Sequence, residues 1–139
     1  MNDIDIDRKG RTRQYKSTQK HHYTSSNSKA SKWKDREIEI ETFDAADYGN
    51  FKQDSSGVSW EDSNNNLWGV LEEYPFVGTE KEQFGFFPST SNSIDRWHGY
   101  PIIPFIKGYE IEDALLKRWV LDGVIDEDDI PTLKRRKRI

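Results

Sequence analysis

The side chains that could carry out acid–base chemistry or bind phosphate lie together in residues 95–105, with the sequence DRWHGYPIIPF. His98 has an imidazole with an ordinary pKa of about 6.5, which suits general acid or base catalysis. Asp95 is placed to orient that ring, and Arg96 to bind a phosphate or an oxyanion. One hypothesis is therefore a small metal-independent nuclease or phosphoryl-transfer enzyme, although the sequence indicates no second acid–base group.

The same segment has a structural interpretation. Gly99 permits a positive φ, and Pro101 restricts Tyr100 to an extended conformation. Trp97 and Tyr100 would then fill the core while His98 caps a turn. We expect Trp97, His98, Gly99, Tyr100 and Pro101 to form the structural hub of the fold.

Two groups of acids could supply the oxygen ligands that Mg²⁺ and Ca²⁺ prefer. They are Glu72-Glu73 and residues 126–129, but the spacing around the second group does not reproduce a calcium-binding loop, and helix capping explains it. The chain has no cysteine, which excludes a disulfide scaffold and a cysteine-ligated metal. We expect no metal and no cofactor.

Charge is unevenly distributed along the 139 residues. Residues 1–36 contain ten Lys/Arg and four Asp, which gives +6, and residues 132–139 contain five Lys/Arg and no acid. Basic ends of this kind indicate phosphate contacts, and the aromatic residues interleaved in the N-terminal segment suit base stacking. The nucleic-acid-binding residues we predict are Arg8, Lys9, Arg11, Arg13, Lys134, Arg135, Arg136, Lys137 and Arg138.

Between the basic ends, residues 37–131 contain six Lys/Arg and twenty-one Asp/Glu, which gives −15. An acidic surface of this size can bind a basic protein face. The sequence therefore favours a non-enzymatic binding or accessory module, with an acidic body that docks a protein partner and basic ends that contact nucleic acid. A further alternative is an inhibitor or immunity-type protein that acts through the acidic surface alone.

The segment at residues 1–32 is polar, lacks Leu, Val and Phe, and has no helical or strand period, so we expect a disordered basic tail. All five Trp, all seven Phe and four of the six Tyr lie in the remainder, where they can build a core. We predict a single α+β domain at residues 33–133, followed by a basic C-terminal tail at residues 134–139.

This domain should contain an aromatic-rich antiparallel sheet of four or five strands packed against one amphipathic helix. The main expected strands are residues 36–43, 67–73, 83–87 and 102–103, and Gly69 and Gly85 mark a bulge or a close approach of backbone. The helix is expected at residues 109–122, followed by a short helical turn in which Ile130 and Leu133 point inward. With no apolar run long enough to span a membrane, the sequence predicts no membrane partner and a cytoplasmic protein, or a nuclear one in a eukaryote.

Overall fold

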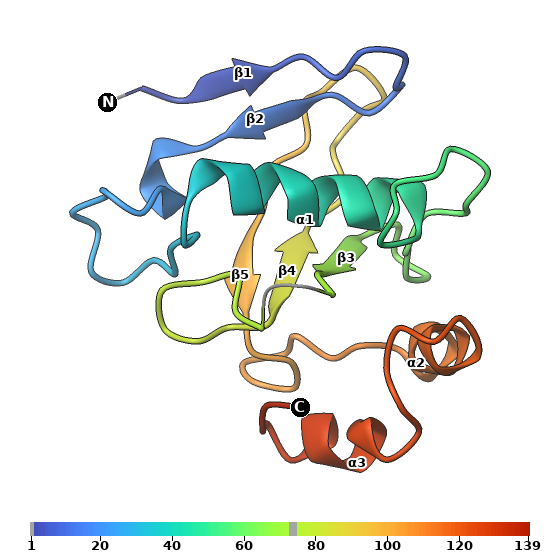
Figure 1. The fold of residues 1–139 in the computed structure, drawn as a ribbon. Coiled ribbons are helices and arrows are strands. Elements are labelled where there is room, and N and C mark those ends of the chain that lie inside the picture. The colour runs from blue at the N-terminus through green and yellow to red at the C-terminus, as the bar shows by residue number, and fades with distance from the viewer. Residues whose placement is uncertain (1, 73–74) are drawn as a thin grey trace.

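The computed structural model of the protein describes residues 2–72 and 75–139. This part of the chain forms a small α+β fold with a two-stranded and a three-stranded antiparallel sheet (Figure 1). Its elements are β1 (Ile4–Ile6), β2 (Tyr15–Ser17), the 3-10 helix η1 (Gln19–His21), α1 (Arg36–Tyr48), β3 (Leu67–Val70), β4 (Phe84–Phe87), β5 (Tyr100–Ile102), α2 (Asp113–Leu121) and α3 (Asp129–Lys134). The expected α+β class is confirmed. The strands are divided between two sheets, and there are three α-helices in the described residues instead of one.

The predicted strand at residues 36–43 is wrong, because these residues begin α1. Asp35 caps the helix by accepting a 2.8 Å hydrogen bond from the backbone N–H of Ile38, and Gly49 ends it with φ of 75°. The alternation of Ile38 and Ile40 with glutamates imitates a strand. Over the whole helix the buried residues, polar ones included, instead recur at helical spacing, at Ile38, Glu39, Thr42, Phe43, Ala45 and Ala46.

The strands expected at residues 67–73, 83–87 and 102–103 correspond to β3, β4 and β5, which pair in that order. Glu73 lies outside the described residues. Gly69 and Gly85 are directly opposite each other in the β3–β4 ladder. A Cβ at Gly69 would lie 2.5 Å from the carbonyl oxygen of Thr42 on α1. The expected close approach of backbone therefore occurs, and it lets α1 lie directly against the sheet.

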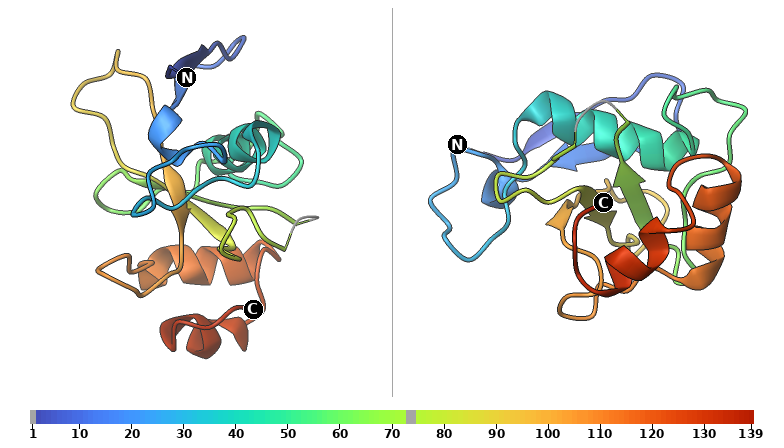
Figure 2. Two further views of the ribbon diagram at one scale, coloured as in Figure 1. Left: turned by 90° about the vertical axis from the view of Figure 1, so that its left-hand side faces the viewer. Right: turned by 60° about the horizontal axis from the view of Figure 1, so that its bottom comes forward.

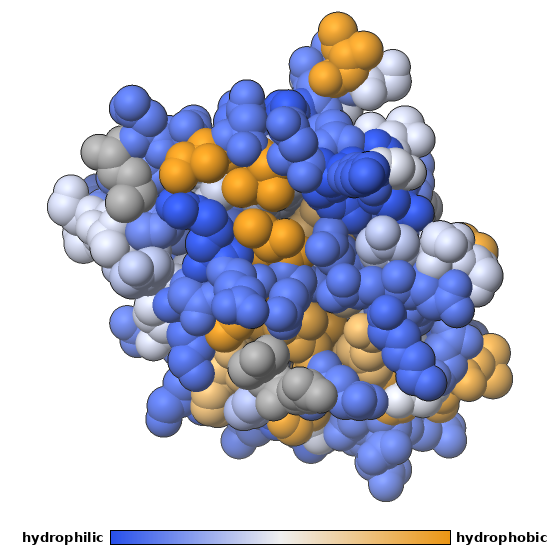
Figure 3. All heavy atoms as spheres, turned by 45° about the horizontal axis from the view of Figure 1, so that its top comes forward, coloured by the Kyte–Doolittle hydropathy of each residue, from blue (hydrophilic) through white to orange (hydrophobic). Residues whose placement is uncertain are grey.

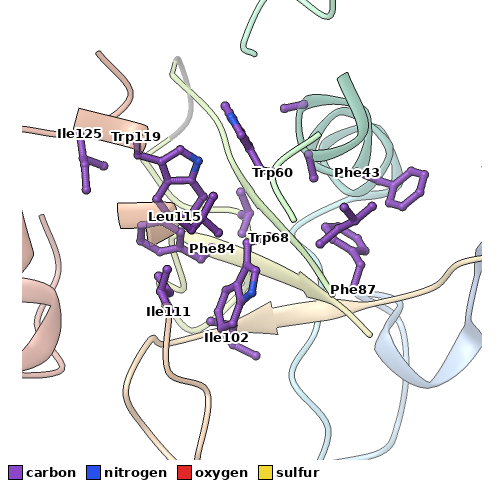
Figure 4. Packing of buried hydrophobic residues seen from close by; sticks show 14 of the residues in the cluster. Phe43, Trp60, Trp68, Phe84, Phe87, Ile102, Ile111, Leu115, Trp119 and Ile125 are labelled. Carbon is purple, nitrogen blue, oxygen red and sulfur yellow. The ribbon is translucent and has the colours of Figure 1, made fainter. Parts of the chain in front are cut away.

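The pleat of β4 supplies the core on both faces of the sheet (Figure 4). Phe87 contacts Phe43 of α1 edge to face, with ring centroids 5.0 Å apart. On the opposite face, Phe84 stacks on Trp119 of α2 at 5.7 Å. The sheet is consequently the middle layer between α1 and the C-terminal helices.

The N-terminal segment also differs from its prediction, because the β1–β2 hairpin and η1 are part of the fold (Figures 1 and 2). The hydroxyls of Tyr15 and Ser17 each donate a 2.7 Å hydrogen bond to the buried carboxyl of Glu39 on α1. The free edge of β2 meets the hub, where the N–H of Lys16 donates to the carbonyl of Trp97 at 2.8 Å. These contacts are made by polar groups. The low apolar content of the segment, on which the prediction of disorder is based, therefore does not reveal them.

The amphipathic helix expected at residues 109–122 is present as α2, which begins later, at Asp113. Residues 109–112 are not helical, yet Ile111 still enters the core beside Leu115 and Trp119. The short helical turn expected after it is α3, whose Leu133 is buried and whose Ile130 packs against the core.

Candidate nucleic-acid interface

Three of the predicted nucleic-acid-binding arginines are ion-paired within the fold. Arg8, Arg11 and Arg13 surround Asp47 of α1 with nitrogen–oxygen distances of 2.7, 3.0 and 2.8 Å. Arg8 also pairs with Asp44 at 2.7 Å. Burial alone would raise the pKa of Asp47, but hydrogen bonds from Arg13 and Arg11 and the charge of Arg8 outweigh it, so the pKa lies below its ordinary value. These arginines hold the hairpin on α1.

Lys9, unlike Arg8, Arg11 and Arg13, is not ion-paired within the described residues. Its side chain is exposed and has no partner among the described residues. Of the four predicted N-terminal cations, it alone keeps its charge directed to solvent.

The C-terminal basic residues lie against the body of the protein instead of extending from it. Lys134 pairs with Asp113 at 3.0 Å, and Arg136 donates from Nε to the carbonyl of Phe105 at 2.9 Å. Arg138 donates from Nε to the carbonyl of Lys81 at 3.2 Å. Within the described chain, the terminal nitrogens of these two guanidinium groups have no hydrogen-bond partner.

Arg135 and Lys137 carry the remaining charge of this run. Both are exposed, and neither side chain has a partner in the described part of the protein. The backbone of Ile139 exchanges two hydrogen bonds of 2.8 and 2.9 Å with the side chain of Gln83, which fixes the run at the surface. The backbone that carries these two free side chains is thus held in a defined place.

The candidate catalytic residues are not brought together. Arg96 binds the hairpin, through Asp7 at 2.7 Å and the carbonyls of Ile6 and Tyr15 at 3.2 and 3.1 Å. Asp95 and His98 are exposed, and no hydrogen bond joins either to Arg96 among the residues described. Although His98 is exposed, part of its ring is shielded from solvent. This shielding lowers the pKa of His98, and the charge of Lys16 lowers it further.

The other hub residues are placed as structural parts of the sheet. Trp97 and Gly99 are buried, and Tyr100 and Pro101 belong to β5. Gly99 does not adopt the positive φ that a glycine permits. A Cβ there would overlap both the carbonyl oxygen of Phe86 and the ring of Phe87, so the position is restricted by close packing.

A cleft of about 590 Å³ lies where β5 faces the N-terminal segment, and sequence reasoning did not find it. His21 stacks on Tyr100 at 4.9 Å, and Tyr100 shares a 2.8 Å hydroxyl–hydroxyl hydrogen bond with Tyr109. Three lysines from two segments of the chain line the same cleft. They are Lys20, Lys29 and Lys107.

The acid groups do not form a metal site in the part of the chain that the structure describes, where no cluster of three or more potential ligands occurs. Asp129 accepts a 2.8 Å hydrogen bond from the N–H of Asp126 and so closes the turn before α3. Glu72 is exposed, and its neighbour Glu73 lies outside the described residues.

Comparison with protein-family models, with curated proteins and with solved structures found no match for this chain. None of the described helices has the length and apolar character needed to cross a membrane.

Proposed function

We propose that the protein is a non-enzymatic binding module that contacts nucleic acid through its C-terminal basic residues and a protein partner through its acidic surface. The observation that carries this proposal is the state of the C-terminal run. It is anchored through Arg136, Arg138 and Ile139, while the side chains of Arg135 and Lys137 have no partner among the described residues. Cations on an anchored backbone lose less conformational freedom on binding than cations on a free tail, and this favours contact with phosphates.

Guanidinium and ammonium groups are the usual partners of the phosphate backbone, and each neutralised phosphate releases counterions. Arg135 and Lys137 have no competing acid within hydrogen-bond distance among the described residues. Arg136 and Arg138 each keep two terminal nitrogens available. The run therefore offers several phosphate contacts without breaking an interaction of the fold.

The acidic side of the proposal rests on exposed carboxylates at the opposite end of α3. Asp126, Glu127 and Asp128, which precede α3, are exposed, while the basic run begins where α3 ends. The face shown in Figure 3, which includes the N-terminal side, is mostly hydrophilic, with hydrophobic residues in separate groups. A basic protein face is the partner that this charge layout complements.

The test is binding to nucleic acid at several salt concentrations, measured by fluorescence anisotropy. The double variant Arg135→Gln/Lys137→Gln should shallow the log–log salt slope by roughly 1.4 to 1.8, since each phosphate contact contributes roughly 0.7 to 0.9. Lys52→Gln/Lys117→Gln removes the same charge from exposed positions elsewhere and should leave the slope close to that of the wild type. Equal slopes for the two double variants would show that the C-terminal run makes no specific contact.

The protein-partner half of the proposal has a separate test. Immobilised wild-type protein should retain a partner in low salt that Asp126→Asn/Glu127→Gln/Asp128→Asn does not retain. If a partner binds and nucleic acid does not, the inhibitor hypothesis replaces the module.

A further inference from the structure

The aromatic cleft beside β5 has the lining of a ligand site. Its volume of about 590 Å³ lies within the range of known small-ligand pockets, which are mainly apolar with a few polar groups. We propose that this cleft binds one nucleotide of a single-stranded nucleic acid, with the base against His21, Tyr100 and Tyr109 and the flanking phosphates on Lys20, Lys29 and Lys107. This inference rests on the proposed function and names the part of the nucleic acid that the protein recognises.

The rings of the cleft are fixed before any ligand arrives. His21 lies nearly parallel to Tyr100, with 25° between the planes, and Tyr109 meets Tyr100 edge to face at 5.8 Å. Phe86 packs against Tyr109 from the sheet at 5.2 Å. All three lining rings are only half-buried, so they combine a rigid position with an accessible surface. Rings held in this way bind a base with little loss of side-chain freedom.

The polar groups of the cleft can meet the edge of a base. The ring of His21 donates from Nδ1 to the carbonyl of Ser31 at 2.7 Å, because a carbonyl can only accept. Burial lowers the pKa of His21, so the ring is neutral near pH 7 and its Nε2 is an acceptor. The hydroxyl pair of Tyr100 and Tyr109 adds a further polar group on the cleft wall.

The charges around the cleft suit a phosphate chain. Lys20 and Lys29 belong to the segment at residues 20–31, on the side that faces the viewer in the left view of Figure 2, and Lys107 belongs to the turn before Tyr109. All three lysines are exposed. The one carboxylate that lines the cleft, Glu82, is buried and accepts a 2.9 Å hydrogen bond from the N–H of Glu80. Cations thus outnumber acids at the mouth of the cleft.

The turn that carries Lys107 also links the cleft to the C-terminal run. Arg136 donates to the carbonyl of Phe105, and the N–H of Phe105 donates to the carbonyl of Tyr109 at 2.7 Å. A strand whose base occupies the cleft can therefore continue toward Arg136. A duplex cannot bind in this way, because its bases are stacked inside the helix and their faces are not available to aromatic side chains.

The experiment measures binding of a fluorescein-labelled oligothymidylate and of a duplex of the same length to the full chain by anisotropy. The wild type should bind the single strand more tightly than the duplex. Tyr109→Leu should weaken single-strand binding by about tenfold through loss of stacking, with little change for the duplex. Lys20→Gln/Lys29→Gln, at exposed positions that can change without affecting the core, should weaken binding and shallow the salt slope by roughly 1.4.

Tyr23→Leu is the matched control, because Tyr23 is also exposed in the N-terminal segment but does not line the cleft. An equal loss in Tyr23→Leu and Tyr109→Leu would mean that stacking is spread over the surface, and it would overturn the cleft proposal. Photo-crosslinking with 5-iodouracil in the strand should label His21, Tyr100 or Tyr109. Labelling confined to other residues would also overturn the proposal.

The outcomes separate the cleft from the proposed function. If Arg135→Gln/Lys137→Gln weakens binding while both cleft variants bind as the wild type does, the C-terminal interface stands and the cleft proposal fails. If the wild type binds neither strand nor duplex, both fail. Binding of free thymidine monophosphate that depends on Tyr109, with no binding of the oligonucleotide, would replace nucleic acid by a free nucleotide.

Discussion

Replacing Glu39 by glutamine should remove a large part of the pH dependence of stability. Glu39 is 1% exposed and accepts hydrogen bonds from the hydroxyls of Tyr15 and Ser17, both at 2.7 Å. Burial raises its pKa from 4.5 to about 7, although both hydrogen bonds and the charge of Arg36 favour the ionised form. The carboxyl is therefore largely protonated in the folded protein at pH 6.

The sign of the effect follows from the two pKa values. Between pH 4.5 and about 7 the carboxyl is ionised in the unfolded chain but still holds a proton in the folded protein, so unfolding releases a proton. The stabilising contribution is complete below pH 4.5 and is lost as pH rises through about 7. The loss over this range is about 3 kcal/mol, since each pH unit of difference corresponds to about 1.36 kcal/mol.

The three histidines act in the opposite direction. Burial lowers the pKa of His21, His22 and His98, so their ionisation favours unfolding as pH falls through about 6.5. Because the histidines are the same in both proteins, the quantity to compare at each pH is the difference in free energy of unfolding between wild type and Glu39→Gln.

We would measure it by urea unfolding, followed by tryptophan fluorescence, from pH 4.5 to 8. The stability of the wild type should fall relative to Glu39→Gln by about 3 kcal/mol across this interval. Glu37→Gln changes an exposed carboxyl in the same helix and should run parallel to the wild type. A constant difference between wild type and Glu39→Gln would refute the assignment of this titration to Glu39.

Three further substitutions test the packing of α1. Asp47→Asn leaves three arginines around a neutral side chain and should cost about 3 kcal/mol at pH 7, with the difference from wild type shrinking in acid as the carboxylate is protonated. Gly69→Ala places a methyl group 2.5 Å from the carbonyl oxygen of Thr42 and should lower stability by about 2 kcal/mol, measured by urea unfolding. Asp35→Ala removes the hydrogen bond to the N–H of Ile38 and should cost about 1 kcal/mol, read as a lower thermal midpoint by circular dichroism.

The two aspartate substitutions share one control, and the glycine substitution is compared with a glycine that has no close neighbour. Asp95→Asn changes an exposed aspartate outside α1 whose carboxylate has no hydrogen-bond partner among the described residues, and it should stay within about 0.5 kcal/mol of the wild type. Gly108→Ala has no atom within 4 Å of the new methyl group, so only its φ of 87° opposes the change. Retention of wild-type stability by Gly69→Ala would argue against the clash with Thr42.

The elements that could be predicted from the sequence are those whose apolar residues recur at a regular spacing within one short segment. The strands around Gly69 and Gly85 and the helix containing Leu115 and Trp119 were found in this way. It did not predict α1, because Ile38 and Ile40 fit a strand over a short window, and only the later residues show helical spacing.

The hairpin and the cleft could not be predicted, for a different reason. The hairpin depends on polar contacts between residues far apart, such as Tyr15 with Glu39 and Arg13 with Asp47, and no local pattern records them. The cleft brings His21 next to Tyr100 and Tyr109, and that neighbourhood exists only after β5 has formed. The segments predicted to be a charged tail and a separate hub are in contact and form one continuous structure.

The attachment of β2 to the hub has a consequence for how the protein is made. Arg96 binds the carbonyl of Tyr15 across a separation of 81 residues, so the ribosome must add that many residues before the contact can form. At roughly 5 to 20 residues per second, this takes roughly 4 to 16 s. During this time one edge of the hairpin has no partner, although α1 can already hold the other contacts. The strands β1 and β2 are therefore synthesised first, but their contact with Arg96 is among the last tertiary contacts to form.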